Sequence, residues 1–288
     1  MKIGIACGGT GGHIFPGLAT ARILHKQGHN ITLWLSGKDM ESTALENWDR
    51  AVVTVPSIGF PARASFHTLV AFLRMLRAAQ VCCKLMKRDM PDVVLGMGSY
   101  ASAPPVLAAR YLRIPIVLHE SNAIAGRAVK FLSRFSDALA IGFDEARSSL
   151  SHKHIVLTGT PLRHNFKKAD SYLWRPLHPD VFTILIMGGS RGAHALNLMA
   201  SDTIISLYES GRKLQVIHLT GLADEKTIRE RYTQIGVPNV VFGFLNTIAQ
   251  AYQHATIAIC RAGAVTCAEI CYYAIPALLV PYPWATGQ

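Results

Sequence analysis

The chain has 288 residues, of which 50% are hydrophobic, and it contains 23 glycines and 14 prolines. This length and composition are sufficient for two domains with cores of their own, and they exclude a chain that is disordered throughout. The formal net charge of +11 indicates an acidic partner, but it does not choose between nucleic acid, anionic lipid and a phosphorylated substrate.

The sequence has no pattern typical of secretion or of a membrane-spanning helix. Residues 1–20 lack the basic and uninterrupted apolar regions of a signal peptide. No window reaches the roughly 18 charge-free apolar residues that a spanning helix requires. The six cysteines form no C-x-x-C pair, which predicts a reducing compartment and no structural zinc. We therefore expect a cytoplasmic protein whose membrane contact, if any, is peripheral.

Short apolar runs rich in β-branched residues alternate with helical patterns, which predicts parallel βαβ units and an α/β fold. In the first half, strands are expected near 2–7, 30–36, 51–56, 92–97, 114–119, 137–142 and 154–158. In the second half, they are expected near 182–187, 213–219, 239–243, 256–260 and 276–280. The periodicity is lost between Thr160 and Pro179, so two doubly wound domains should join near residue 165.

A glycine-rich loop at 8–13 follows the first strand and leads into a helical pattern. Backbone N–H groups and a helix N-terminus meet in such a loop, which favours binding of a phosphate. Similar loops occur at 96–100 and 188–193, and three of them are hard to explain as tight corners alone. A dinucleotide site is less favoured, because G-x-G-x-x-G spacing and an acid closing the second strand are both missing. His13 is the residue of the first loop that can transfer a proton.

The region 60–89 combines apolar residues at helical spacing with a run of cations. Phe66, Leu69, Val70, Leu73 and Leu76 form the apolar set, and the cations are Arg63, Arg74, Arg77, Lys84, Lys87 and Arg88. One interpretation is an amphipathic helix that packs on its own sheet and exposes a basic face. The other is a surface for an anionic membrane.

Two further stretches place polar residues after predicted strands, where open sheets bind ligands. The first is His119-Glu120-Ser121-Asn122, which follows an apolar strand. The second runs from Arg261 to Glu269, an acid within an otherwise apolar helical pattern. The carboxylate of Glu269 has two acceptor oxygens for the hydroxyls of a ribose, and a structural ion pair with Arg261 is the alternative.

Together these motifs resemble the MurG family, the UDP-N-acetylglucosamine transferases that complete lipid II in bacterial peptidoglycan synthesis. The matching stretches follow the family's order along the whole chain and read GGTGGHIFPGLA (8–19), GMGSYASAP (96–104), HESNAIAGRA (119–128), TGTPLR (158–163), GGSRGAHALN (188–197) and RAGAVTCAEI (261–270). The resemblance implies the GT-B fold, in which two Rossmann-like parallel-sheet domains face a cleft. Residues 1–164 would be the acceptor and membrane-associating domain, and residues 165–288 the donor domain.

The resemblance further implies an inverting transfer of N-acetylglucosamine from UDP-N-acetylglucosamine to the C4 hydroxyl of lipid I, undecaprenyl-pyrophosphoryl-N-acetylmuramoyl-pentapeptide. The enzyme would act at the cytoplasmic face of the bacterial plasma membrane as a peripheral protein, with region 60–89 on anionic lipid. We expect neither a cofactor nor a metal, because no D-x-D sequence is present. Nucleic-acid binding is not expected, since no basic run is interleaved with aromatic residues.

The resemblance also assigns roles to residues. His13 takes the position of the general base. The implied substrate-binding residues are Thr10, Gly11, Gly12, Asn122, Arg163, Ser190, Leu245, Ala264, Val265, Thr266, Glu269 and Gln288. Within this set, Ser190 is expected at the UDP phosphates, the backbone near Leu245 at the uracil and Glu269 at the ribose. The expected acceptor-side residues are Gly98, Ser99, Tyr100 and Glu120.

The chain departs from the family pattern at Ser121, Arg191 and Ala262. It also stops at Gln288 inside the expected donor loop, where family members continue, so we expect a fragment whose donor domain is truncated. Three alternatives stay open: a UDP-sugar glycosyltransferase with another acceptor, a sugar-nucleotide epimerase, and a UDP-sugar-binding fragment without catalytic activity.

Overall fold

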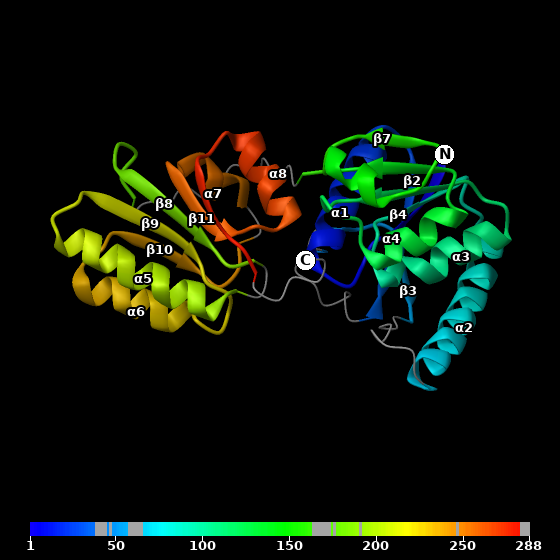
Figure 1. Ribbon diagram of the computed structural model, residues 1–288, viewed down its shortest axis with the longest axis horizontal. Coiled ribbons are helices and arrows are strands. Elements are labelled where there is room, and N and C mark those ends of the chain that lie inside the picture. The colour runs from blue at the N-terminus through cyan, green and yellow to red at the C-terminus, as the bar shows by residue number, and fades with distance from the viewer. Residues whose placement is uncertain are drawn as a thin grey trace. The chain divides into compact units, whose positions relative to one another are not determined.

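The computed structural model describes residues 1–37, 45, 48–56, 66–162, 174, 177–189, 192–245 and 248–282, and for 66–69 it describes the backbone alone. The chain divides into two compact units, Met1–Arg163 and a second unit that starts at His164. Each unit is a parallel sheet with helices packed against both faces (Figure 1). These are the two doubly wound α/β units that the alternating patterns predict.

The first unit contains a sheet of seven parallel strands in the order β3-β2-β1-β4-β5-β6-β7. Its strands are β1 (Lys2–Ala6), β2 (Asn30–Ser36), β3 (Val52–Val55), β4 (Val93–Gly96), β5 (Ile116–Glu120), β6 (Ala138–Ile141) and β7 (Ile155–Leu157). Its helices are α1 (Gly11–Lys26), α2 (Phe66–Arg88), α3 (Ala103–Tyr111) and α4 (Arg127–Leu132), with 3-10 turns at Tyr100–Ser102, Ser133–Phe135 and Asp144–Ser149.

The second unit contains five parallel strands in the order β10-β9-β8-β11-β12. They are β8 (Phe182–Met187), β9 (Leu214–Leu219), β10 (Asn239–Phe242), β11 (Ile257–Arg261) and β12 (Ala277–Val280). In Figure 1, α5 (His194–Glu209) and α6 (Glu225–Ile235) cover one face of this sheet, and α7 (Ile248–His254) and α8 (Ala264–Tyr273) cover the other. Every strand expected from the sequence occurs within two residues of its expected bounds.

The apolar runs are continuous because each central strand is buried on both faces. In β8, Ile184 and Ile186 belong to the core under α5 and α6. The alternate residues, Leu185 and Met187, belong to the core under α7 and α8. Successive side chains of a strand point to opposite faces, so one apolar run supplies two cores.

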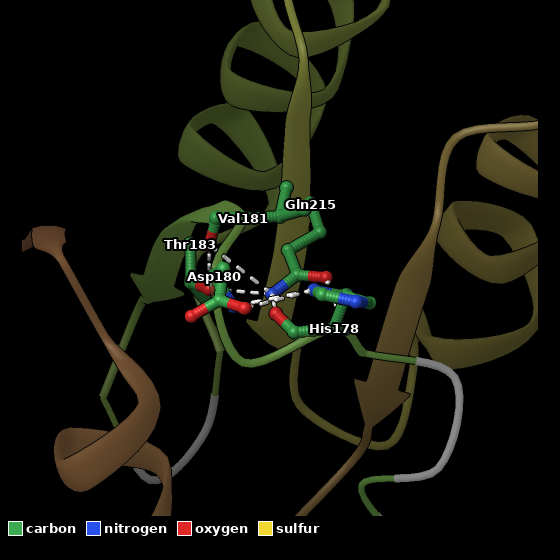
Figure 2. Close-up of polar contacts among 5 residues, drawn as sticks. All are labelled: His178, Asp180, Val181, Thr183 and Gln215. Carbon is green, nitrogen blue, oxygen red and sulfur yellow. Dashed lines mark hydrogen bonds and ion pairs between the residues drawn. The ribbon is translucent and has the colours of Figure 1, made fainter.

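A buried polar contact holds the segment that enters β8 (Figure 2). Gln215 of β9 is 2% exposed. Its Nε2 donates to the carbonyl of His178 at 2.7 Å and to Thr183 Oγ1 at 2.7 Å, and its Oε1 accepts from the backbone N–H of His178 at 2.8 Å. These bonds satisfy the buried amide and anchor the chain at the amino ends of the strands, whereas the glycine loops lie at the carboxyl ends.

The helix expected in region 60–89 is present as α2, but its buried face differs from the one inferred from the sequence. Leu73 and Leu76 are 51% and 40% exposed. The prediction that the helix packs through these two residues is therefore wrong. The buried side chains of α2 are mostly small, with two methionines among them, and they are Ala71, Met75, Ala78, Ala79, Cys82 and Met86. The close approach of α2 to α3 explains the choice, since Cys83 Sγ lies 3.8 Å from the carbonyl oxygen of Ala108. Residues 60–65, with Arg63, lie outside the described residues.

Candidate functional site

Each sheet has one point where the chain reverses its direction of winding. In the first unit this switch point lies between β1 and β4, and in the second it lies between β8 and β11. Open α/β sheets bind ligands at the carboxyl ends of the two strands that flank such a point. The predicted glycine loops follow β1, β4 and β8, so all three lie at a switch point of their own unit.

The loop after β1 brings Thr10 and His13 together. Thr10 is the residue that precedes α1, a position where a threonine hydroxyl usually caps the helix, but its side chain makes no capping hydrogen bond. Its Oγ1 instead lies 3.0 Å from Nδ1 of the His13 ring. The hydroxyl thus orients the imidazole, and the first backbone N–H groups of α1, including those of Gly11 and Gly12, receive no side-chain cap from it.

The loop after β4 lies beside the first loop. Gly98 has a φ of +85°, and a Cβ there would lie 2.9 Å from the carbonyl oxygen of His119 and 4.0 Å from the His13 ring. Only glycine fits this close approach without strain. The hydroxyl of Ser99 is buried and has no hydrogen-bond partner within the described part of the chain. The neighbouring Tyr100 is exposed.

Glu120, at the end of β5, is buried and hydrogen-bonded within its own loop. Its carboxylate accepts from the backbone N–H of Asn122 at 2.9 Å, from Asn122 Nδ2 at 2.7 Å and from the N–H of Gly126 at 2.7 Å. Charged acceptors make strong hydrogen bonds, so this carboxylate holds the loop that follows β5. The geometry thus gives Glu120 a role in positioning Asn122, whose amide Nδ2 it engages.

His119 precedes this carboxylate and is a neutral buried group. Burial lowers the pKa of its imidazole below the ordinary value, although the bond to Gly159 opposes the shift. Nε2 donates to the carbonyl of Gly159 at 3.0 Å, and Nδ1 lies 3.3 Å from Ser121 Oγ. The ring therefore joins the end of β5 to the segment after β7.

The second unit has a pocket of about 630 Å³ at its own switch point. The pocket is formed by the ends of β8 and β11, the starts of α5 and α8 and the segment after β12, and its lining residues are Gly188, Gly192, Ala193, His194, Ala195, Arg261, Ala262, Gly263, Pro281 and Tyr282. Neither helix has a side-chain cap or an acid in its first turn. Two helix N-termini with open N–H groups favour an anion in this pocket.

Glycine is required at the base of the pocket. Gly192 has a φ of +77°, and a Cβ there would lie 2.1 Å from the carbonyl oxygen of Thr220. The pocket wall also carries Arg261, whose Nη1 donates to the carbonyl of Pro281 at 2.7 Å and whose guanidinium lies 5.7 Å from the Tyr282 ring centre. Arg261 thus ties the end of β11 to the segment after β12.

The structure places the remaining expected donor residues in or near α8. Ala264, Val265 and Thr266 form its first turn, directly after the pocket residue Gly263. Glu269 is buried, and its carboxylate accepts a hydrogen bond from the Tyr252 hydroxyl at 2.8 Å.

Four of the expected donor residues remain, and the structure describes one of them. The side chain of Leu245 belongs to the core of the second unit. Arg163, Ser190 and Gln288 lie outside the described residues.

One contact of the pocket was missed by sequence reasoning. His194, the first residue of α5, lies with its Nδ1 2.9 Å from Asp224 Oδ1. The two residues are 30 positions apart, so neither helical nor strand spacing links them. A hint was available, because both residues stand where a helical pattern begins after a predicted strand.

Known proteins resemble the chain over its whole length. The model of the glycosyltransferase family 28 N-terminal domain matches residues 3–141, and that of the family 28 C-terminal domain matches residues 183–288. The solved structure of MurG from Acinetobacter baumannii superposes with a TM-score of 0.72 at 29% identity, covering 99% of this chain and 79% of that one.

Several similar curated proteins carry the name UDP-N-acetylglucosamine--N-acetylmuramyl-(pentapeptide) pyrophosphoryl-undecaprenol N-acetylglucosamine transferase. The protein of this name from Geobacter sulfurreducens is 35% identical over an alignment of 294 positions, which covers 100% of this chain and 80% of the relative. The one from Hahella chejuensis is 36% identical over 285 residues, which cover 99% and 78%. The chain therefore belongs to glycosyltransferase family 28, and within it to the MurG family of N-acetylglucosamine transferases with the GT-B fold.

Proposed function

We propose that the chain transfers N-acetylglucosamine from UDP-N-acetylglucosamine to the C4 hydroxyl of lipid I, with inversion, to give lipid II. The observation that supports this function best is the pair of switch-point loops within a chain that belongs to the MurG family. The first loop holds an oriented histidine, and the loop after β8 opens the N-terminus of α5 into a pocket that the N-terminus of α8 also lines. A transferase with a diphosphate leaving group needs both a base and an anion site.

In this proposal the second unit binds the donor. The diphosphate of UDP lies at the N-termini of α5 and α8, where backbone N–H groups donate hydrogen bonds to it and stabilise its charge without a metal. Ser190 is assigned to the same phosphates. Ala264, Val265 and Thr266 of the first turn of α8 lie beside this anion. Glu269, oriented by the Tyr252 hydroxyl, binds the ribose. Arg163, Leu245 and Gln288 complete the proposed donor set.

The first unit binds the acceptor in this proposal. Gly11, Gly12 and Thr10 offer the open start of α1 to the pyrophosphate of the lipid. The buried Ser99 hydroxyl has no partner within the described residues, so a ligand oxygen there would satisfy it. Gly98 and Tyr100 flank it in the same loop. Asn122 is held by Glu120 and contacts the sugar that is transferred.

The proposed reaction is a single displacement. The C4 oxygen of the acceptor attacks the anomeric carbon of the donor, a new glycosidic bond forms, and the bond between that carbon and the β-phosphate oxygen breaks, so that UDP leaves. His13 accepts the hydroxyl proton. Its Nδ1 faces the Thr10 hydroxyl at 3.0 Å, and the tautomer that donates from Nδ1 leaves Nε2 as the basic atom.

Calorimetric titration tests the donor half of the proposal. UDP-N-acetylglucosamine should bind more tightly than the N-acetylgalactosamine and glucose analogues, and EDTA should not change its affinity. Equal affinity for the three donors, or loss of binding on adding EDTA, would contradict the proposal. Product analysis with lipid I and UDP-N-acetylglucosamine tests the acceptor half. Transfer to a different acceptor and not to lipid I would favour the other-acceptor glycosyltransferase, and formation of an epimeric sugar nucleotide would favour the epimerase.

For the same chain we propose peripheral binding to the cytoplasmic face of the plasma membrane through α2. Phe72, Leu73 and Leu76 are between 40% and 51% exposed, and the cations Arg74, Arg77, Lys84, Lys87 and Arg88 of the same helix are exposed as well. In this arrangement the apolar side chains enter the membrane interface, and the cations bind the headgroups of anionic lipids. No helix within the described residues is long and apolar enough to span a membrane.

Vesicle binding tests the membrane proposal. Reversal of Arg74, Arg77 and Lys84 to Glu should weaken binding to vesicles that contain phosphatidylglycerol, and added salt should weaken the binding of the unsubstituted chain. The affinity for UDP should stay the same in the variant. Vesicle binding that is unaffected by the three reversals would contradict the proposal.

A further inference from the structure

A line of buried polar side chains crosses the second unit and ends at the pocket. Tyr232 of α6, His218 of β9 and Asn197 of α5 are fully buried. His218 Nδ1 lies 3.0 Å from the Tyr232 hydroxyl, and His218 Nε2 lies 3.2 Å from Asn197 Oδ1. Asn197 Nδ2 then donates to Asp224 Oδ2 at 2.7 Å and to the carbonyl of Thr220 at 2.7 Å. None of these residues has a role in the transfer as proposed above.

The direction of each hydrogen bond follows from its neighbours. Asn197 Nδ2 is the donor to Asp224 and Thr220, so Asn197 Oδ1 must accept, and His218 Nε2 must carry a hydrogen. His218 Nδ1 is then the acceptor for the Tyr232 hydroxyl. The ring stays neutral, because burial lowers its pKa to about 3 even though Asp224 opposes the shift. The network therefore has a single pattern of donors and acceptors.

Asp224 is the point at which this network meets the pocket. Its Oδ1 lies 2.9 Å from Nδ1 of His194, and its other oxygen receives Asn197. Burial alone would raise the pKa of Asp224, but the hydrogen bonds from Asn197 and His194 outweigh burial and hold it below the ordinary value. The side chain of Asp224 is 16% exposed and that of His194 is 72% exposed. A fixed carboxylate thus holds an accessible imidazole on the pocket wall.

We propose that His194 binds the diphosphate of a nucleoside diphosphate in this pocket, and that Asp224, held by Asn197, is the residue that positions it. This inference rests on the proposed donor site. With Nδ1 turned to Asp224, the ring presents Nε2 to the ligand, and in the protonated ring Nε2–H donates a charge-assisted hydrogen bond to a phosphate oxygen. Arg261 also lies on the wall. Its Nη1 donates to the carbonyl of Pro281, and its buried Nε has no partner within the described residues.

Calorimetric titration of the full chain with UDP, and with uridine as the ligand without phosphate, tests the inference. His194→Ala should weaken UDP binding by about 10- to 100-fold, the worth of a hydrogen bond to a charged group, and leave uridine binding unchanged. His194→Lys, which supplies a cation at the same position, should recover affinity to within about 3-fold of the original. Asp224→Asn keeps the shape but removes the charge, and should cost about 3- to 5-fold for UDP alone.

His178→Ala is the matched control. His178 is another exposed histidine of the second unit, and its Nδ1 lies 3.9 Å from a carboxylate oxygen of Asp180, but it is not part of the pocket wall. UDP affinity should be unchanged in this variant. His194→Ala that binds UDP as tightly as the original, or that loses UDP and uridine equally, would overturn the inference and leave the donor site standing. An unsubstituted chain that fails to bind UDP would overturn the donor site itself.

Discussion

The two switch points use the same backbone device but give their histidines different partners. In the first unit, a glycine loop opens α1, and the ring of His13 faces the neutral hydroxyl of Thr10. In the second unit, a glycine loop opens α5, and the ring of His194 faces the carboxylate of Asp224. The imidazole of His13 thus meets a neutral hydroxyl through Nδ1, whereas that of His194 meets a carboxylate through the same atom. The same backbone device therefore orients two histidines through different partners.

Each unit also contains a buried histidine that has no role in the proposed transfer. His119 in the first unit and His218 in the second are buried at 3% and 0% exposure, and burial lowers the pKa of each. They serve as neutral hydrogen-bonding links between strands and loops. The exposure of a histidine and its hydrogen-bond partner therefore decide whether its ring can reach a ligand.

The largest expected effect concerns the proton-accepting half of the comparison. His13→Ala should lower kcat for transfer from UDP-N-acetylglucosamine to lipid I by about 10²-fold or more, the usual contribution of a general base. The dissociation constant for UDP should not change, because UDP is assigned to the second unit. Steady-state kinetics and calorimetry measure the two quantities. A variant with near-normal turnover would end the assignment of His13 as the base.

The second effect concerns the glycine that lines the anion pocket. Gly192→Ala should lower the free energy of unfolding by more than about 2 kcal/mol, because a positive φ is unfavourable for alanine and its Cβ would also collide with Thr220. Gly189→Ala is the control: φ there is +96°, but apart from its chain neighbours no atom of the described residues lies within 4 Å of the added Cβ. The control should lose about 1 kcal/mol. Urea denaturation compares them, and equal losses would mean that the backbone of Thr220 yields to the methyl group.

The third effect follows from the neutral histidine of the second unit. The pKa of His218 is about 3 in the folded chain and about 6.5 in an unfolded chain. The unfolded chain therefore binds an extra proton between these values, so stability falls as the pH is lowered through this range, by up to about 1.4 kcal/mol per pH unit.

Urea denaturation at pH 6.5 and pH 5.0 measures this slope. His218→Gln retains a donor and an acceptor but does not titrate, and it should reduce the slope while His119 maintains the rest. An unchanged slope in the variant would show that His218 does not carry the effect.

The smallest expected effect tests the neutral partner in the first loop. Thr10→Val removes the hydroxyl that faces His13 and should lower kcat by about 3- to 10-fold, the worth of one neutral hydrogen bond. Thr10→Ser retains the hydroxyl and should recover most of the activity. A serine variant as slow as the valine variant would show that the methyl group, and not the hydrogen bond, orients the ring.

Strand positions were predictable because a strand buried on both faces must be apolar at every residue, as in Ile184 to Met187. The buried face of α2 was not predictable, because several apolar faces compete on that helix. Its larger side chains suggested Leu73 and Leu76, whereas close contact with α3 requires residues such as Ala78 and Ala79. Helical spacing reports which residues share a face, but only the neighbouring helix decides which face is covered.

The sequence by itself determined the two α/β units and the glycine loops that follow their strands, because local spacing and motif order carry that information. The tertiary structure decided which groups meet: Thr10 with His13, Glu120 with its own loop, Tyr252 with Glu269, and Asp224 with His194. The last two pairs join residues 17 and 30 positions apart. Such contacts depend on how strands and helices pack, and no periodicity within one element encodes them.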